Sequence, residues 1–191
     1  PELYFQCKLY TGNGSDNHAI TFDGSEDMSP NIVWMKSRTQ SGYNQYLVDT
    51  LRGVTKALRP NLYNDEDTYT DAFKSFDSNG FTLDDDSSNS EINQNTKTYV
   101  AWAWKTGTNG SGTTTGSGTG QAYTYSVNTT AGVSMMAYTG NGTANHTIPH
   151  NLGSTPEMFM VKIRTGDNNN WGVYHHKSNA NPEQYALYLD G

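Results

Sequence analysis

The chain has 191 residues, a formal net charge of −7 at pH 7 and only 34% apolar residues. The charge argues against a nucleic-acid partner, because affinity for a phosphate backbone depends on clustered Lys and Arg side chains. No apolar run approaches the ~18 residues needed to cross a bilayer, so no membrane insertion is expected. The 19 Gly, 13 Tyr, 6 Phe and 4 Trp residues are typical of short strands that bury one face and are joined by polar turns.

Cysteine usage bears on the compartment in which the chain folds. Cys7 is the only cysteine, so an internal disulfide is excluded. Residues 1–10 lack the basic and apolar regions of a secretory signal peptide. Both features predict folding in a reducing cytoplasm, with Cys7 as a small buried apolar residue.

Two continuous apolar runs, residues 32–35 and 158–161, each lie shortly after a proline. Runs of this kind are typical of central strands that are buried on both faces. Short runs at residues 46–48, 133–138 and 185–189 predict further strands.

The segment 67–83 contains the clearest turn. An Asn79-Gly80 pair between Phe76 and Phe81 predicts a β-hairpin, because both turn residues accept positive φ. The residues just before it, 67–76, are the only candidate for a helix, of one or two turns.

Residues 98–104 alternate strictly between bulky and smaller side chains, which is the periodicity of a strand. Val100, Trp102 and Trp104 share one face, and we expect Trp34, Trp102 and Trp104 to belong to the core. Strands at short, regular spacing predict an all-β chain folded as an antiparallel β-sandwich.

The sequence also repeats itself. Residues 10–15 (YTGNGS) recur as residues 138–143 (YTGNGT), an offset of 128 (138 − 10), and residues 30–38 match residues 156–164 at an offset of 126 (156 − 30). We therefore predict a first unit over residues 1–105. A Gly/Thr/Ser-rich linker follows over residues 106–122, with a long surface loop as its alternative. Residues 123–191 are then the start of a second, truncated copy of the unit.

The second copy has no counterpart of residues 52–105. Half a sandwich leaves an apolar face uncovered. Three explanations stay open: the chain continues in nature, another chain supplies the missing half, or the fragment packs on the first unit. The first explanation is favoured.

One acidic turn is a candidate metal site. Asp84, Asp85 and Asp86 are consecutive and precede polar residues, and oxygen ligands on a loop suit Ca²⁺. The spacing of an EF-hand loop is absent, and a solvated loop is the alternative. No other cofactor is expected.

A second candidate site is a set of loop tyrosines with neighbouring amides, since sugars bind aromatic faces and amide groups. Its members are Tyr43, Asn44, Tyr63, Asn64 and Tyr69. No nucleophile elbow, phosphate-binding loop or dinucleotide fingerprint occurs, so no enzyme is expected.

Several motifs together resemble a domain that is repeated in tail-fibre and other structural proteins of marine and cyanobacterial bacteriophages. They lie in the same order at residues 4–14, 30–36, 48–56, 75–83, 98–105, 138–142 and 170–175. The resemblance implies a lectin-like, concanavalin-type jelly roll in a virion appendage, and it carries over no binding residues. The acidic turn at Asp84 departs from the family pattern, which has small residues there.

From this resemblance we expect a structural module of a phage tail fibre or appendage that is folded in the host cytoplasm before assembly. Its expected partners are other virion proteins, further copies of itself and host-surface polysaccharide. Two alternatives are a purely architectural head-decoration or tail-assembly protein and a glycan-degrading tailspike domain. A carboxylate pair suited to hydrolysis is not apparent in the sequence.

Overall fold

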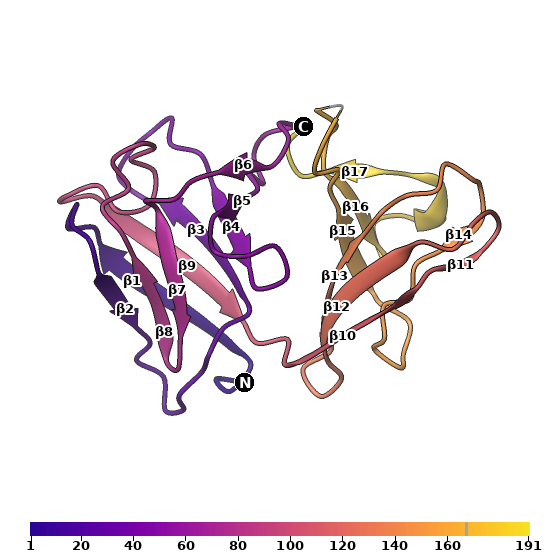
Figure 1. The fold of residues 1–191 in the computed structure, drawn as a ribbon, viewed down its shortest axis with the longest axis horizontal. Coiled ribbons are helices and arrows are strands. Elements are labelled where there is room, and N and C mark those ends of the chain that lie inside the picture. Colours follow the sequence, from indigo (N-terminus) through magenta and orange to yellow (C-terminus); the bar gives the residue numbers. More distant parts are fainter. Residues whose placement is uncertain (167) are drawn as a thin grey trace.

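The computed structural model describes residues 1–166 and 168–191, and the regular secondary structure of these residues is almost entirely β-strand (Figure 1). Every strand pair is antiparallel, which confirms the predicted all-β, sandwich-like class. None of the described helical segments is long and apolar enough to cross a membrane. The elements are β1 (Phe5–Thr11), β2 (His18–Thr21), β3 (Ile32–Ser37), β4 (Tyr46–Asp49), β5 (Lys56–Ala57), β6 (Asp67–Thr68), β7 (Phe73–Asp77), β8 (Gly80–Leu83), β9 (Thr98–Trp104), β10 (Thr108–Thr113), β11 (Thr115–Gly116), β12 (Ala122–Asn128), β13 (Val133–Tyr138), β14 (His146–Thr147), β15 (Met158–Val161), β16 (Gly172–His175), the 3₁₀ turn η1 (Pro182–Gln184) and β17 (Leu187–Tyr188).

Residues 1–105, here called the N-terminal part, form a two-layer sandwich. One sheet has the order β1-β9-β3-β4 and the other β2-β8-β7. Figure 1 shows these strands on the left. The core lies between the sheets and contains fully buried side chains from both, among them Val33, Tyr99 and Phe81.

The orientation of β9 reverses the predicted core. Tyr99, Ala101 and Ala103 are the fully buried side chains, whereas Trp102 and Trp104 lie half-exposed on the opposite face. The prediction that the indoles fill the core is therefore wrong. Its physical reason is core packing: aromatic rings from both sheets, Tyr99 of β9 among them, fill the interior, and the other inward positions of β9 hold alanines.

The predicted hairpin is confirmed, because β7 and β8 pair through Phe76↔Phe81 and Asp77↔Gly80. The two turn residues are Ser78 and Asn79 instead of the expected Asn79 and Gly80, since Gly80 begins β8, and of the expected pair only Gly80 has positive φ. Gly80 has a φ of 122°, and a Cβ there would lie 2.1 Å from the Ile20 carbonyl oxygen, so only glycine fits. The helix expected at residues 67–76 is wrong: this stretch contributes β6 and β7 instead.

The prediction that Cys7 is buried is also wrong. Cys7 is exposed, not buried, because it shares the outer face of β1 with Phe5 and Leu9. Alternation along β1 gives the buried positions to Gln6 and Tyr10.

Residues 106–191, here called the C-terminal part, contain three small sheets with the orders β10-β12-β13, β11-β14 and β15-β16-β17. The stretch expected to be a flexible linker differs from that expectation, because it forms β10 and β11. Gly110 and Gly112 face Tyr125 and Tyr123 across the strand pair, and a Cβ at either glycine would lie within 2.7 Å of the tyrosine ring. The missing side chains of these glycines leave room for the tyrosine rings to lie over the edge strand β10.

The strands of the two parts correspond in order and spacing. β13 and β14 begin 128 residues after β1 and β2, at residues 133 and 146 against 5 and 18. β15 and β16 begin 126 residues after β3 and β4, at 158 and 172 against 32 and 46. The register agrees as well, since Ile32 pairs with Asp49 and Met158 pairs with His175.

Burial differs between these corresponding strands. β3 lies between β9 and β4 and buries Val33 and Met35 completely. β15 is the end strand of its sheet, and its four side chains are 39–51% exposed. The prediction that residues 158–161 form a central strand buried on both faces is therefore wrong. For residues 32–35 the central position is confirmed, but Ile32 and Trp34 are partly exposed, so only one face is buried.

The two parts contact each other through side chains. The Trp171 indole Nε1 donates a buried hydrogen bond to the Arg59 backbone oxygen at 3.0 Å. Arg164 donates from Nε and Nη2 to the two Glu66 carboxylate oxygens at 2.9 and 3.0 Å. The loop that follows Arg59 is therefore fixed against the C-terminal part.

Candidate functional site

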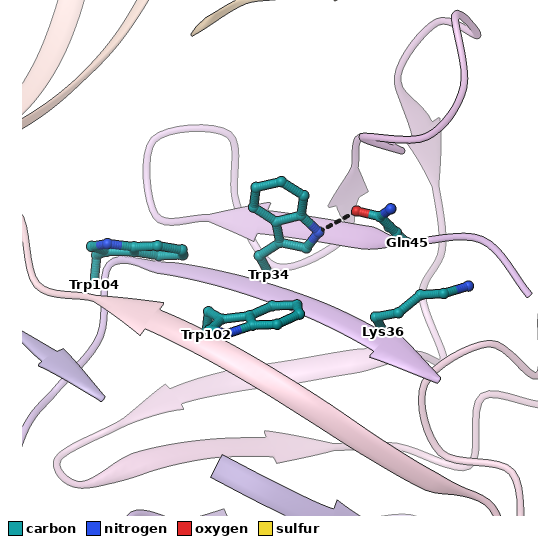
Figure 2. A pocket seen from close by; sticks show the side chains of 5 residues that line it. All are labelled: Trp34, Lys36, Gln45, Trp102 and Trp104. Atoms are coloured by element: carbon teal, nitrogen blue, oxygen red, sulfur yellow. Dashed lines mark hydrogen bonds between the residues drawn. The ribbon is translucent and has the colours of Figure 1, made fainter. Parts of the chain in front are cut away.

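A hollow of about 340 Å³ lies on the outer face of the β1-β9-β3-β4 sheet, on the side away from the core. We call it the tryptophan hollow. Figure 2 shows three indoles on one side of β3 and β9, with an amide and an ammonium group toward one end. Its lining residues are Trp34, Lys36, Gln45, Trp102 and Trp104.

Strand register brings these side chains together. Trp34 pairs directly with Trp102 across β3 and β9, and Trp104 lies two residues further along β9 on the same face. The Trp34 and Trp102 rings meet edge to face, with centroids 6.1 Å apart and planes at 70°. This is a favoured geometry for aromatic pairs, so each ring limits the freedom of the other.

Hydrogen bonds fix the polar end. The Trp34 indole Nε1 donates to Gln45 Oε1 at 2.8 Å, and the Gln45 backbone N–H donates to Asn61 Oδ1 at 2.7 Å. Lys36 donates from Nζ to the backbone oxygen of Tyr43. The hollow is therefore held in place before any ligand binds.

Two of the predicted sugar-binding residues border this site. Tyr43 and Asn44 directly precede Gln45, but their side chains are engaged inside the protein. Tyr43 Oη donates to Gln94 Oε1 at 2.5 Å, and Asn44 Nδ2 donates to Glu91 Oε1 at 2.8 Å. They support the polar end of the hollow without lining it.

The other predicted tyrosines do not line the hollow either. Tyr69 accepts a hydrogen bond from Arg59 Nη2 at 2.6 Å, and the guanidinium carbon lies 5.4 Å from the Tyr69 ring centroid. Tyr63 and Asn64 are exposed, and the Tyr63 backbone oxygen accepts a hydrogen bond from Lys162 Nζ at 2.9 Å. Tyr69 is thus linked to Asn44 through Arg59 and Glu91. None of the five predicted residues lines the hollow.

The acidic turn does not converge either. Lys74 Nζ forms an ion pair with Asp84 Oδ1 at 2.8 Å, and the Ser87 N–H donates a hydrogen bond to Asp85 Oδ1 at 3.2 Å. Asp86 is fully buried and points inward. Across residues 1–166 and 168–191 no group of three or more His, Cys, Asp or Glu side chains could hold a metal ion.

Asp86 has a structural environment of its own. Its Oδ2 accepts hydrogen bonds from the backbone N–H groups of Ile92 and Asn93 at 2.7 and 3.2 Å, and its Oδ1 has no partner. Burial raises the pKa of Asp86 to about 6, although the two backbone hydrogen bonds act against this shift. The carboxyl therefore organises the loop that precedes β9.

Sequence reasoning missed the hollow because it assigned the tryptophans to the core. One signal was present: Lys36 lies two residues after Trp34 on the same strand face. Lysine is rarely buried, so this spacing marks the Trp34 face of β3 as the outer one.

A family model described as a domain of unknown function, DUF7483, matches residues 1–191. The chain belongs to this family. The match runs through both the N-terminal and the C-terminal part of the chain. No curated protein and no solved structure matches the chain.

Proposed function

We propose that the protein is a non-enzymatic, glycan-binding module of a bacteriophage tail fibre or similar virion appendage, and that the tryptophan hollow contacts the glycan. The observation that carries the glycan proposal is the set of three partly exposed indoles beside an amide and an ammonium group on one sheet face. Soluble domains rarely leave several indoles together at the surface without a binding role.

The chemistry of the hollow suits a sugar. The C–H face of a pyranose ring packs on an aromatic surface, while its hydroxyl groups require polar partners at the edge. Trp34, Trp102 and Trp104 supply the aromatic surface, and Lys36 and Gln45 supply the polar edge. A hollow of about 340 Å³ is at the small end of ligand sites, which suits a short stretch of a polysaccharide.

Such a small, open site binds weakly on its own. Repetition of the module in an oligomeric appendage would convert weak sites into strong attachment through avidity. This agrees with the resemblance of the sequence motifs to repeated phage appendage domains, and other virion proteins are then its structural partners.

The lining of the hollow favours binding over hydrolysis. Glycan cleavage in most glycosidases needs two carboxyl groups on either side of the scissile bond. The five side chains that line the hollow include no Asp or Glu. The glycan-degrading tailspike alternative would require a separate site.

The proposal is tested by incubating the purified chain with immobilised bacterial polysaccharides and a glycan array. We expect saturable binding to a subset of glycans, and Trp102→Ala should weaken it at least about tenfold, as removal of an aromatic anchor does. Val100→Ala is the matched control, because Val100 lies on the same face of β9 outside the hollow.

Two results would count against the proposal. If no polysaccharide binds, the purely architectural alternative replaces it. If binding occurs and both variants bind like the parent chain, the glycan site lies outside the tryptophan hollow.

A further inference from the structure

We propose that β13 and β15 form an acceptor site for one further β-strand, whose sequence pattern is that of β9. The inference is independent of the glycan site. β13 and β15 are end strands of their sheets, and they correspond to β1 and β3. In the N-terminal part, β9 fills the place between β1 and β3.

The direction of backbone groups shows which edge each strand leaves open. In an antiparallel pair, alternate residues direct their N–H and C=O groups to one neighbour, and the intervening residues direct theirs to the other side. In β1 the even-numbered residues face β9. Gly12 N–H donates to the Lys97 oxygen at 2.8 Å, and Lys105 N–H donates to the Tyr4 oxygen at 2.9 Å, in continuation of the strand register.

β13 leaves the corresponding edge open. Thr114 N–H donates to the Gln121 oxygen at 2.8 Å, so the odd-numbered residues of β12 face β10 and the even-numbered ones face β13. The latter pair with odd-numbered residues of β13. The backbone groups of the even-numbered residues Ser134, Met136 and Tyr138 therefore point to the free edge. They correspond, at an offset of 128, to the β1 residues that face β9.

The same holds for β15. His176 N–H donates to the Glu157 oxygen at 2.8 Å, so the odd-numbered residues of β15 face β16. The backbone groups of Met158 and Met160 point to the open edge. In β3 the even-numbered residues face β9, as the Arg38 N–H to Thr98 oxygen bond at 2.7 Å shows. Both edges thus offer the backbone groups that β9 satisfies in the N-terminal part.

Side-chain exposure supports the same site. Phe159 and Val161, the counterparts of the fully buried Val33 and Met35, are 45% and 42% exposed. Tyr138, the counterpart of Tyr10, is 39% exposed against 9%. Apolar side chains on a strand with an unpaired edge are what recognition by strand addition uses.

The pattern of the occupant follows from β9. Its inward positions carry Tyr99 and two alanines, and its outward positions carry Val100 and two tryptophans. We expect the occupant to be a polypeptide segment of this kind, with small inward side chains after one aromatic residue. The β9 of a second copy cannot serve, because it is paired on both edges with β1 and β3.

The test is a synthetic peptide of residues 97–105 added to the intact chain. We expect binding at a ratio of one peptide to one chain by calorimetry. Backbone hydrogen exchange should slow by at least about tenfold at Ser134, Met136, Met158 and Met160, since pairing protects amides from opening. Exchange at the odd-numbered residues, which are already paired, should change much less.

Two variants control the test. A peptide with Ala101→Pro lacks the N–H that would donate to the oxygen of Met136, and it should not bind. In the chain, Met160→Pro removes one donor from the open edge of β15 while the bonds to β16 remain, and it should abolish binding of the parent peptide.

Two outcomes would overturn the proposal. One is the absence of peptide binding by a chain whose exchange pattern shows intact β13 and β15. The other is protection of the same four amides in the free protein that rises with protein concentration, which would show that a second copy pairs with these edges.

Discussion

The indole N–H of Trp171 donates to the backbone oxygen of Arg59 at 3.0 Å, and this buried hydrogen bond joins residues 112 positions apart in the chain. Trp171 is only 4% exposed, and Arg59 is equally buried. The bond therefore connects the C-terminal part to the loop between β5 and β6 in the N-terminal part.

Trp171→Phe tests how much this hydrogen bond contributes to the stability of the protein. The substitution keeps an aromatic ring but leaves the Arg59 carbonyl without its partner, which costs about 1–3 kcal/mol for a buried group. We expect a lower midpoint of urea unfolding. Trp34→Phe also loses an indole donor, but that residue is half-exposed and water can replace it, so it should be much less destabilising.

The Glu66 carboxylate should make the contact between the two parts sensitive to acid. Burial by itself would raise the pKa of Glu66, but hydrogen bonds from Arg164 and Arg52 outweigh it and lower the pKa below its usual value. The stabilisation is present at neutral pH and is lost as the pH falls through the lowered pKa.

Glu66→Gln should abolish this acid-dependent loss. The substitution should also lower the free energy of unfolding at pH 7, because it removes the ion pairs of Glu66 with Arg52 and Arg164. Equilibrium unfolding of the two proteins between pH 3 and pH 7 measures the effect. Equal slopes in both proteins would contradict it.

Asp86 should make stability depend on pH in the direction opposite to Glu66. The pKa of Asp86 rises from 3.8 to about 6 in the folded protein, so the folded state binds a proton more tightly than the unfolded state. Stability from this group is complete below about pH 4, falls as the pH rises to about 6, and is level above that. A shift of this size corresponds to at most about 3 kcal/mol.

Asp86→Asn should remove that decline between pH 4 and pH 6, because an amide does not titrate there. The amide oxygen can still accept from the N–H groups of Ile92 and Asn93, so the loop should keep its conformation. Urea unfolding at several pH values measures the slope. A decline that persists in the variant would assign it to another group.

Ala101→Leu tests which face of β9 is inward. The methyl group of Ala101 is fully buried between the sheets, and three extra carbons there should cost about 1–3 kcal/mol through overpacking. Val100→Leu, on the outer face of the same strand, should change the unfolding free energy by less than about 0.5 kcal/mol. Equal effects of the two changes would show that the faces are assigned wrongly.

Local features of the fold were predictable. The strict alternation of residues 98–104 and the Asn79-Gly80 pair are local signals, and they predicted a strand and a hairpin that the structure contains, with the turn one residue earlier than expected. The internal repeat also corresponds to strands that begin at the same spacing in both parts.

The inward face of β9 was not predictable in the same way. Alternation defines two faces, but the choice between them depends on the side chains of the opposite sheet. Phe73 and Phe81 occupy the space there, stacked with centroids 5.6 Å apart. Ala101 and Ala103 belong to the same buried cluster, and the bulkier indoles lie on the outer face.

The metal site expected at the acidic turn and the flexible linker expected at the glycine-rich segment were not found for a related reason. Three consecutive aspartates suggest a shared ion, but Asp86 is held inward by two backbone N–H groups that come from later in the chain. Glycines suggest a flexible connection, yet Gly110 and Gly112 lie beneath tyrosine rings of the paired strand. Composition indicates how much conformational freedom the unfolded chain has. Contacts with residues distant in the sequence determine how much of that freedom is lost on folding.

The position of Cys7 has a practical consequence. It is the only cysteine in the chain, its side chain is exposed, and it pairs with Trp102 across β1 and β9. A maleimide dye attached to this thiol would report from the strand next to the indoles without any engineered mutation. Because tryptophan quenches many dyes on contact, molecules that cover the rings would change the dye's brightness, and their arrival and departure could be followed in real time.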